Sequence, residues 1–152
     1  MDTFGQGEAE KTEEIYQQIK LPRRATAGSA GYDFFAPVSF RLSPGETVKI
    51  PTGIRVEMEP EWVLKCYPRS GLGFKYRLQL NNTVGIIDSD YFYSDNEGHM
   101  FAKVTNDSKE EKTVEIAAGE GFMQGIFVEY GITVDDQVTA VRNGGFGSTS
   151  KR

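Results

Sequence analysis

Short apolar runs recur along the chain from Tyr32 to Tyr130, and each is bounded by Pro, Gly, Asn or Asp. Such spacing is typical of strands joined by tight turns, and stretches such as residues 43–46 (Ser-Pro-Gly-Glu) are turn signals. The runs predict strands at residues 32–37, 38–42, 47–50, 54–58, 62–67, 84–87, 100–104, 113–117 and 122–130. The pattern therefore predicts an all-β sandwich.

The two ends of the chain depart from this pattern. Residues 1–20 are acidic and rich in Glu, Lys and Gln, which favours a short helix or a frayed segment. Residues 142–152 are rich in Gly, Ser, Thr and basic side chains, which predicts a flexible tail unless a ligand orders it. Residues 21–141 are then expected to form a single β domain, because 152 residues suffice for one domain with a real core.

Composition narrows the classes of function. Lys plus Arg number 17 against 22 Asp plus Glu, a formal net charge of −5, so a nucleic acid polymer is not an expected partner. The one cysteine, Cys66, is expected to be a small strand or core residue, and the one histidine, His99, is too solitary to build a metal site. The absence of a long apolar segment and of a signal-like start argues against a membrane and favours the cytoplasm.

The apolar run 84–87 stops abruptly at two carboxylates and an aromatic ring, Asp88, Asp90 and Tyr91. Gly85 permits a close approach of a ligand to the backbone. On a regular strand Asp88 and Asp90 would share a face and Tyr91 would point the other way, whereas a turn after Ile87 would change that geometry. Asp-Ser-Asp is also ordinary turn chemistry, so taken alone the stretch favours a plain hairpin.

Four other segments carry candidate chemistry, and each also has a plain structural explanation. Asp33 ends a run of small residues that suits a loop leading into a strand. Arg69 and Ser70 lie in a glycine-rich stretch that could bind phosphate or form a surface turn. Gln124 lies inside an apolar run, where it either packs with satisfied hydrogen bonds or faces a site. The tail combines Arg142 with glycines, hydroxyls and a single aromatic ring, or is simply disordered.

Taken together and in order, these segments resemble the five motifs of the dUTP pyrophosphatase (dUTPase) family. The resemblance runs from about residue 21 to 150, with motifs at residues 29–33, 68–73, 82–91, 119–124 and 144–149. It implies a distorted jelly-roll subunit and a homotrimer. Its three active sites would be assembled at subunit boundaries, with the tail of one chain closing over a neighbour's pocket.

The resemblance also implies magnesium-dependent hydrolysis of dUTP to dUMP and pyrophosphate. Asp88 would be the general base that activates a water for in-line attack on the α-phosphorus. Asn82 and the backbone at Gly85 would bind uracil, Tyr91 would lie against the deoxyribose, and Asp33 would reach Mg²⁺ through water. The remaining residues that would contact the substrate are Arg69, Ser70, Gly71, Gln124, Arg142, Phe146 (stacked on the base), Gly147, Ser148 and Thr149.

The sequence departs from the family pattern in four places, one of which is an acidic N-terminus without the clear first strand that many members show. Residues 92–98 are longer than the usual connection and predict a small extra loop. Gly121 stands where many members have an arginine, and Arg142 lies one residue closer to the glycines of the tail than in many members.

Two alternative functions remain open. A deoxycytidine triphosphate deaminase of the same superfamily needs a glutamate base that the third motif lacks, which argues against it. A nucleotide-gated binding protein would use the ordering of the tail as a signal to a partner.

Overall fold

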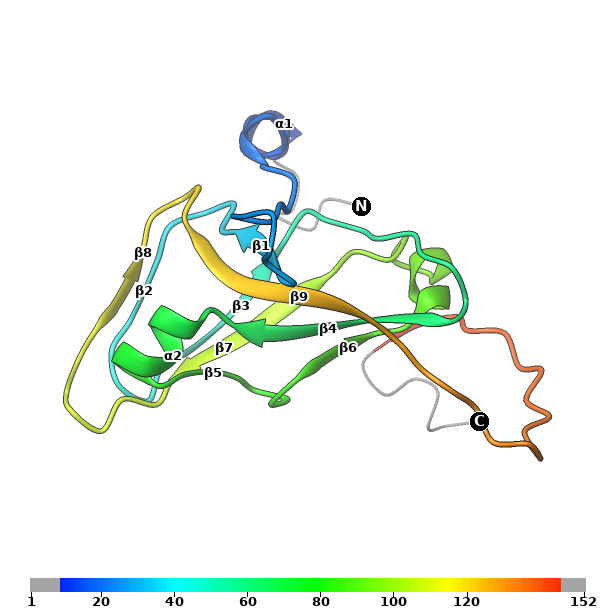
Figure 1. The fold of residues 1–152 in the computed structure, drawn as a ribbon. Coiled ribbons are helices and arrows are strands. Elements are labelled where there is room, and N and C mark those ends of the chain that lie inside the picture. Colours follow the sequence, from blue (N-terminus) through cyan, green and yellow to red (C-terminus); the bar gives the residue numbers. More distant parts are fainter. Residues whose placement is uncertain (1–8, 146–152) are drawn as a thin grey trace.

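The computed structural model describes residues 9–145 and is built from antiparallel β-sheets packed around one core (Figure 1). The four-stranded sheet has the order β1 (Tyr32–Phe35), β9 (Gly121–Glu129), β4 (Trp62–Pro68), β6 (Gly85–Ile87). The three-stranded sheet has the order β3 (Thr47–Pro51), β7 (Phe101–Asn106), β5 (Leu78–Leu80), and β2 (Phe40–Leu42) pairs with β8 (Val114–Ile116). The prediction of an all-β fold is confirmed.

The core forms where the inward faces of these strands meet. Along β7, Ala102, Val104 and Asn106 are buried while Lys103 is exposed, as the two-residue period of a strand requires. Asn106 is a buried polar residue with satisfied hydrogen bonds, because its Nδ2 donates to the carbonyl oxygens of Leu42 (2.9 Å) and Lys112 (2.8 Å). It therefore ties β7 to the small β2–β8 sheet.

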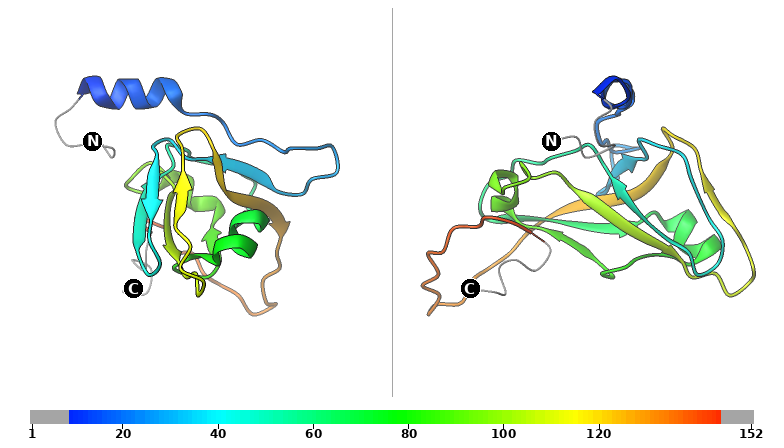
Figure 2. Two further views of the ribbon diagram at one scale, coloured as in Figure 1. Left: turned by 90° about the vertical axis from the view of Figure 1, so that its left-hand side faces the viewer. Right: turned by 180° about the vertical axis from the view of Figure 1, so that it is seen from behind.

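Two helices and a short 3-10 helix complete the described chain. Helix α1 (Ala9–Gln18) stands away from the sandwich (Figure 2), which matches the helix alternative for the N-terminal segment. Helix α2 (Ser70–Tyr76) follows β4, and the 3-10 helix η1 (Ser89–Tyr93) follows β6. Over residues 9–145, no helix has the length and apolar character that crossing a bilayer requires.

One predicted strand was wrong, and some elements of the structure were not predicted. Residues 54–58 do not form a strand, although Ile54 is buried and Arg55 is exposed as in one. The backbone of this segment does not pair with a neighbouring strand, although the Met100 N–H donates to the Ile54 carbonyl oxygen (2.9 Å). The strand β5 and the helix α2 were missed, because β5 has only two apolar residues, Leu78 and Leu80, and α2 contains two glycines, which disfavour helix.

Candidate active site

A cavity opens between two strands that are neighbours in sequence but belong to different sheets. β5 pairs with β7, and β6 pairs with β4, so both are the last strand of their sheet. The cavity has a volume of about 630 Å³ and is lined by residues 84–88, residues 80–82 and residues 100–103 among others. An edge strand carries unpaired N–H and C=O groups along its outer side. The cavity, which we call the slot, is therefore suited to binding a ligand through main-chain atoms.

The floor of the slot is backbone and a thiol. Gly85 lies opposite Cys66 in the β4–β6 pair, and a Cβ added at Gly85 would lie 3.1 Å from the Cβ of Cys66. Cys66 is a buried strand residue, as predicted, and burial raises the pKa of its thiol to about 12. The thiol is therefore protonated at neutral pH and presents a small apolar surface to the slot.

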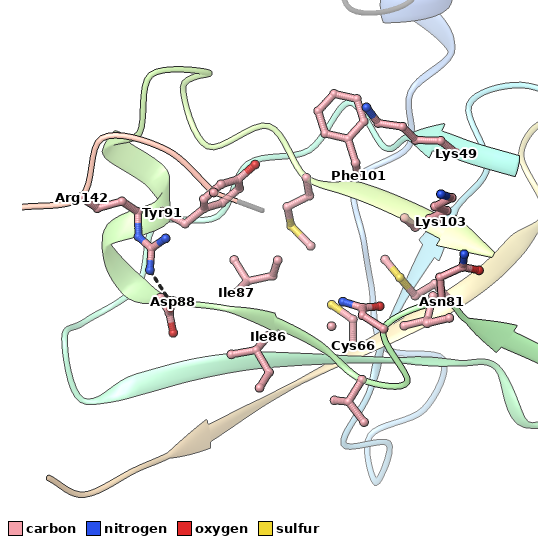
Figure 3. Close-up of a pocket in the computed structure, with 18 residues that line it drawn as sticks. Lys49, Cys66, Asn81, Ile86, Ile87, Asp88, Tyr91, Phe101, Lys103 and Arg142 are labelled. Carbon is pink, nitrogen blue, oxygen red and sulfur yellow. Dashed lines mark hydrogen bonds and ion pairs between the residues drawn. The ribbon is translucent and has the colours of Figure 1, made fainter. Parts of the chain in front are cut away.

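The Asp88 carboxylate and the Arg142 guanidinium meet at the mouth of the slot (Figure 3), and the Asp90 carboxylate pairs with the same guanidinium. Because η1 begins at Ser89, Asp88 and Asp90 do not continue the strand, and the turn alternative holds. Arg142 Nη2 lies 2.6 Å from Asp88 Oδ2, and Arg142 Nε lies 2.7 Å from Asp90 Oδ1. The two carboxylates are about half exposed (52% and 55%), so Asp88 is open to water at the edge of the slot.

Tyr91 forms a wall of the slot and is held by its hydroxyl group. The hydroxyl donates to the His99 carbonyl oxygen (2.7 Å) and accepts from Asn96 Nδ2 (2.9 Å). His99 Nε2 in turn accepts the Gly53 N–H (2.9 Å), and burial lowers the pKa of the His99 imidazole. The imidazole is therefore a neutral acceptor at pH 7, and Tyr91 rests on a fixed support.

The start of the tail lies against this same slot. Asn143 O accepts the Asp95 N–H (2.8 Å), and a Cβ on Gly145 would lie 2.8 Å from Cε1 of Tyr91. Residues 142–145 therefore cover part of the slot of their own chain, whereas the resemblance implied that the tail closes over a neighbour's pocket. The roles predicted for Phe146, Gly147, Ser148 and Thr149 concern residues outside the described range.

A second cluster of predicted residues, which we call the arginine cluster, lies where β4 ends. Arg69 Nε is 3.4 Å from Asp33 Oδ1, and Gln124 Nε2 donates to the Pro68 carbonyl oxygen (3.2 Å). Gln124 is partly buried, its side-chain amide is hydrogen-bonded, and it lies opposite Asp33 in the β1–β9 pair. Ser70 and Gly71 form the exposed first turn of α2 next to this cluster.

Two glycines make room for the arginine cluster. A Cβ on Gly121 would lie 2.8 Å from Arg69 Nη1, and a Cβ on Gly31 would lie 2.5 Å from Gln124 Oε1. Both distances are too short for a real Cβ atom. The sequence indicated only that Gly121 lacks an arginine side chain; the structure adds that the Arg69 guanidinium packs over it.

Asp88 at the mouth of the slot and Arg69 of the arginine cluster do not meet within one chain. Ile87, just before Asp88, is paired with Leu64, and Arg69 lies five residues beyond Leu64. At about 3.3 Å per residue, more than about 15 Å of strand separates the two groups. In Figure 1, α2 lies at one end of β4 and the 3-10 helix lies toward the other end. The predicted catalytic residues therefore form two half-sites.

Some slot residues were not predicted. Lys49, Phe101 and Lys103 line it, with Lys49 Nζ 4.5 Å from the centre of the Phe101 ring. Their sequence signal is weak, because they read as the outward positions of ordinary strands. Among the described residues, no group of three or more His, Cys, Asp or Glu side chains is placed to hold a metal ion.

An antiparallel β-sandwich with an edge-lined slot and a separate arginine cluster has the features of an all-β protein that handles a small anionic ligand. Comparison with known proteins gives the family. The dUTPase family model matches residues 17–150, and the chain belongs to this family.

Named relatives agree over nearly the whole chain. The deoxyuridine 5′-triphosphate nucleotidohydrolase of Lactococcus lactis is 43% identical over 134 residues, covering 86% of this chain and 88% of that protein. The Haemophilus influenzae protein of the same name is 38% identical over 146 residues, covering 91% and 92%. The crystal structure of a Streptococcus mutans dUTPase superposes with a TM-score of 0.67 at 38% identity, covering 79% of this chain and 91% of that one. The fold is therefore of the dUTPase type, in agreement with the jelly-roll prediction.

Proposed function

We propose that this chain hydrolyses dUTP to dUMP and pyrophosphate. The observation that carries the proposal is the position of Asp88. It is a half-exposed carboxylate at the mouth of a slot whose walls include the main chain of β6 and the ring of Tyr91.

The slot suits a uracil base and its sugar. The polar edge of uracil has both donors and acceptors, which match the N–H and C=O groups of an edge strand. Asn82 lines the slot at the turn before β6, and Gly85 keeps the backbone free of a side chain there. Tyr91 would then lie against the deoxyribose, where a 2′-hydroxyl would meet its ring.

Asp88 would act on water. Its free oxygen accepts a proton from a water, which attacks the α-phosphorus as the bond to the bridging oxygen of the β-phosphate breaks. Arg142, now paired with Asp88 and Asp90, would exchange these carboxylates for phosphate oxygens when the triphosphate binds. Arg69, Ser70 and Gln124 would hold the phosphates nearer the reacting centre.

Mg²⁺ fits this site as a companion of the substrate. A lone carboxylate such as Asp33, already beside Arg69, suits contact through water better than direct ligation. When bound, Mg²⁺ would neutralise charge on the triphosphate oxygens that hold most of its coordination shell.

A complete site would form between copies of the chain, in a homotrimer. The separation of the two half-sites supports this, because the slot of one chain needs the arginine cluster of another. So does the segment after β9, which extends from the sandwich (Figure 1). Large apolar side chains of this segment are exposed to solvent. The exposed side chains are Ile132 (73%), Val134 (108%), Val138 (79%) and Val141 (80%). Burial by neighbouring chains would remove this surface from water.

The test is direct. Purified protein incubated with dUTP and Mg²⁺ should release dUMP and pyrophosphate, and should act far more slowly on UTP, dTTP and dCTP. No dUMP at high enzyme concentration would contradict the proposal. Release of ammonia from dCTP would indicate the deaminase alternative.

Replacing Gly121 by alanine is expected to lower kcat/KM for dUTP about tenfold with little change in melting temperature. The new Cβ would collide with Arg69 Nη1, the mobile end of a partly exposed side chain, so the guanidinium moves and the fold does not. Steady-state kinetics and thermal unfolding measure the two effects. Gly73→Ala is the matched control, because Gly73 lies in α2 with nothing within 4 Å of the added Cβ and is not among the residues expected to contact the substrate. Equal kinetic losses in the two variants would contradict the prediction.

A further inference from the structure

The extra loop at residues 92–98 has no part in the proposed mechanism, yet one of its side chains reaches the slot wall. Asn96 Nδ2 donates to the Tyr91 hydroxyl (2.9 Å), which itself donates to the His99 carbonyl oxygen (2.7 Å). A phenol has a single hydrogen to donate, and here it both donates and accepts. The ring of Tyr91 cannot swing without breaking one of these bonds.

The amide of Asn96 is oriented by the loop itself. Its Oδ1 accepts from Ser94 Oγ (2.7 Å) and from the Gly98 N–H (3.2 Å), which directs Nδ2 toward Tyr91. Gly98 has φ +75°, and a Cβ there would lie 2.6 Å from Phe92 Cα, so the loop closes only around a glycine. The donor to Tyr91 is thus held by a tight turn.

The loop is also fixed on its outer side. The Arg55 guanidinium lies 3.7 Å from the centre of the Phe92 ring, and its Nη2 donates to the Phe92 carbonyl oxygen (2.9 Å). The Tyr93 hydroxyl donates to Glu57 Oε1 (3.0 Å). The irregular segment 54–58 therefore supports the loop from outside while Asn96 supports Tyr91 from inside.

We propose that Asn96 is a positioning residue that holds Tyr91 in place and thereby sets the preference for 2′-deoxyribose over ribose. The inference rests on the proposed function, in which Tyr91 lies against the sugar. One extra oxygen is a small difference, so a wall that rejects it must be unable to retreat. A residue that merely stabilised the loop would affect deoxy and ribo substrates alike.

Asn96→Asp is the sharpest test, because it keeps the size of the side chain and the acceptor for Ser94 and Gly98 but replaces the donor to Tyr91 by an acceptor. The single phenol hydrogen can then serve either this carboxylate or the His99 carbonyl oxygen, so one of the two bonds that hold Tyr91 is lost. We expect the ratio of kcat/KM for dUTP to that for UTP to fall about fivefold, chiefly through faster turnover of UTP. Tyr91→Phe should lower the ratio similarly, and the double variant should lower it no further than either single variant. Glu97→Gln, an exposed position in the same loop, should leave the ratio unchanged.

The outcomes separate this inference from the proposed function. If the wild-type protein hydrolyses dUTP but Asn96→Asp and Tyr91→Phe keep its selectivity, or if their effects add, the role of Asn96 is overturned and the function stands. If dUTP is not hydrolysed, the affinities of the wild-type protein and of Asn96→Asp for dUMP and UMP are compared by calorimetry. The inference then holds only if the wild-type protein binds dUMP more tightly than UMP and Asn96→Asp reduces this difference. Should Asn96→Asp fail to fold, Tyr91→Phe carries the test: it removes the bond from Asn96 together with the bond to the His99 carbonyl oxygen, so a lower ratio supports the inference and an unchanged ratio overturns it.

Discussion

Asp88→Asn is expected to lower kcat for dUTP by about 10³-fold while changing the affinity for a non-hydrolysable dUTP analogue less than about threefold. Asparagine has the shape of aspartate and can still accept a hydrogen bond from Arg142, but it cannot take a proton from water. Pre-steady-state turnover and calorimetric titration with the analogue measure the two quantities.

Asp90→Asn is the matched control for this variant. Asp90 pairs with the same guanidinium as Asp88 and is exposed to a similar degree, so the same substitution removes an equivalent ion pair. We expect Asp90→Asn to lower kcat by less than about tenfold, because an exposed ion pair contributes little energy. Equal losses at the two positions would mean that both carboxylates act by holding Arg142, and the assignment of Asp88 as the base would be wrong.

The parts of the fold that could be predicted are those with a strong local signal. The seven residues of β4 and the nine of β9 alternate or run apolar between clear turn residues, and both strands formed where expected. The three-residue strand β5 was missed, although the equally short β2, β6 and β8 lie within predicted runs, because it becomes a strand only by pairing with β7, a partner distant in sequence. Residues 54–58 were wrongly predicted as a strand for the same reason. They have the apolar pattern of a strand, but no neighbouring strand pairs with them.

The site was predicted as a set of residue types, but its spatial arrangement could not be predicted. The motif order placed Asp88 and Arg69 in one mechanism, whereas their separation follows from the register of Ile87 on Leu64. Asn96 had no signal at all, because a polar residue in a surface loop is ordinary. Its contact with Tyr91 depends on how residues 92–98 fold back over η1.

The separation of the half-sites predicts that two inactive variants should restore each other. Asp88→Asn and Arg69→Ala subunits, each inactive alone, are expected to regain about one quarter of wild-type activity when unfolded and reassembled at equal amounts. A site is intact only where a chain with Asp88 meets a neighbour with Arg69, and random assembly gives each condition a chance of about one half. The side chain of Arg69 is 45% exposed, so its loss should leave the fold intact. Initial rates per site, measured after size-exclusion chromatography, test this.

A second mixture tests whether the recovered activity comes from sites that two chains share. Reassembling the wild-type chain with the double variant Asp88→Asn/Arg69→Ala should leave about one quarter of the sites active if each site is shared, but about one half if each chain builds its own. The two models therefore predict different pairs of activities. If sites are shared between chains, both mixtures should have about the same activity; if each chain builds its own site, the first mixture should be inactive and the second about half active. A slot that found its arginine cluster within the same chain would require β4 to bring Asp88 and Arg69 together, and the β4–β6 register holds them apart.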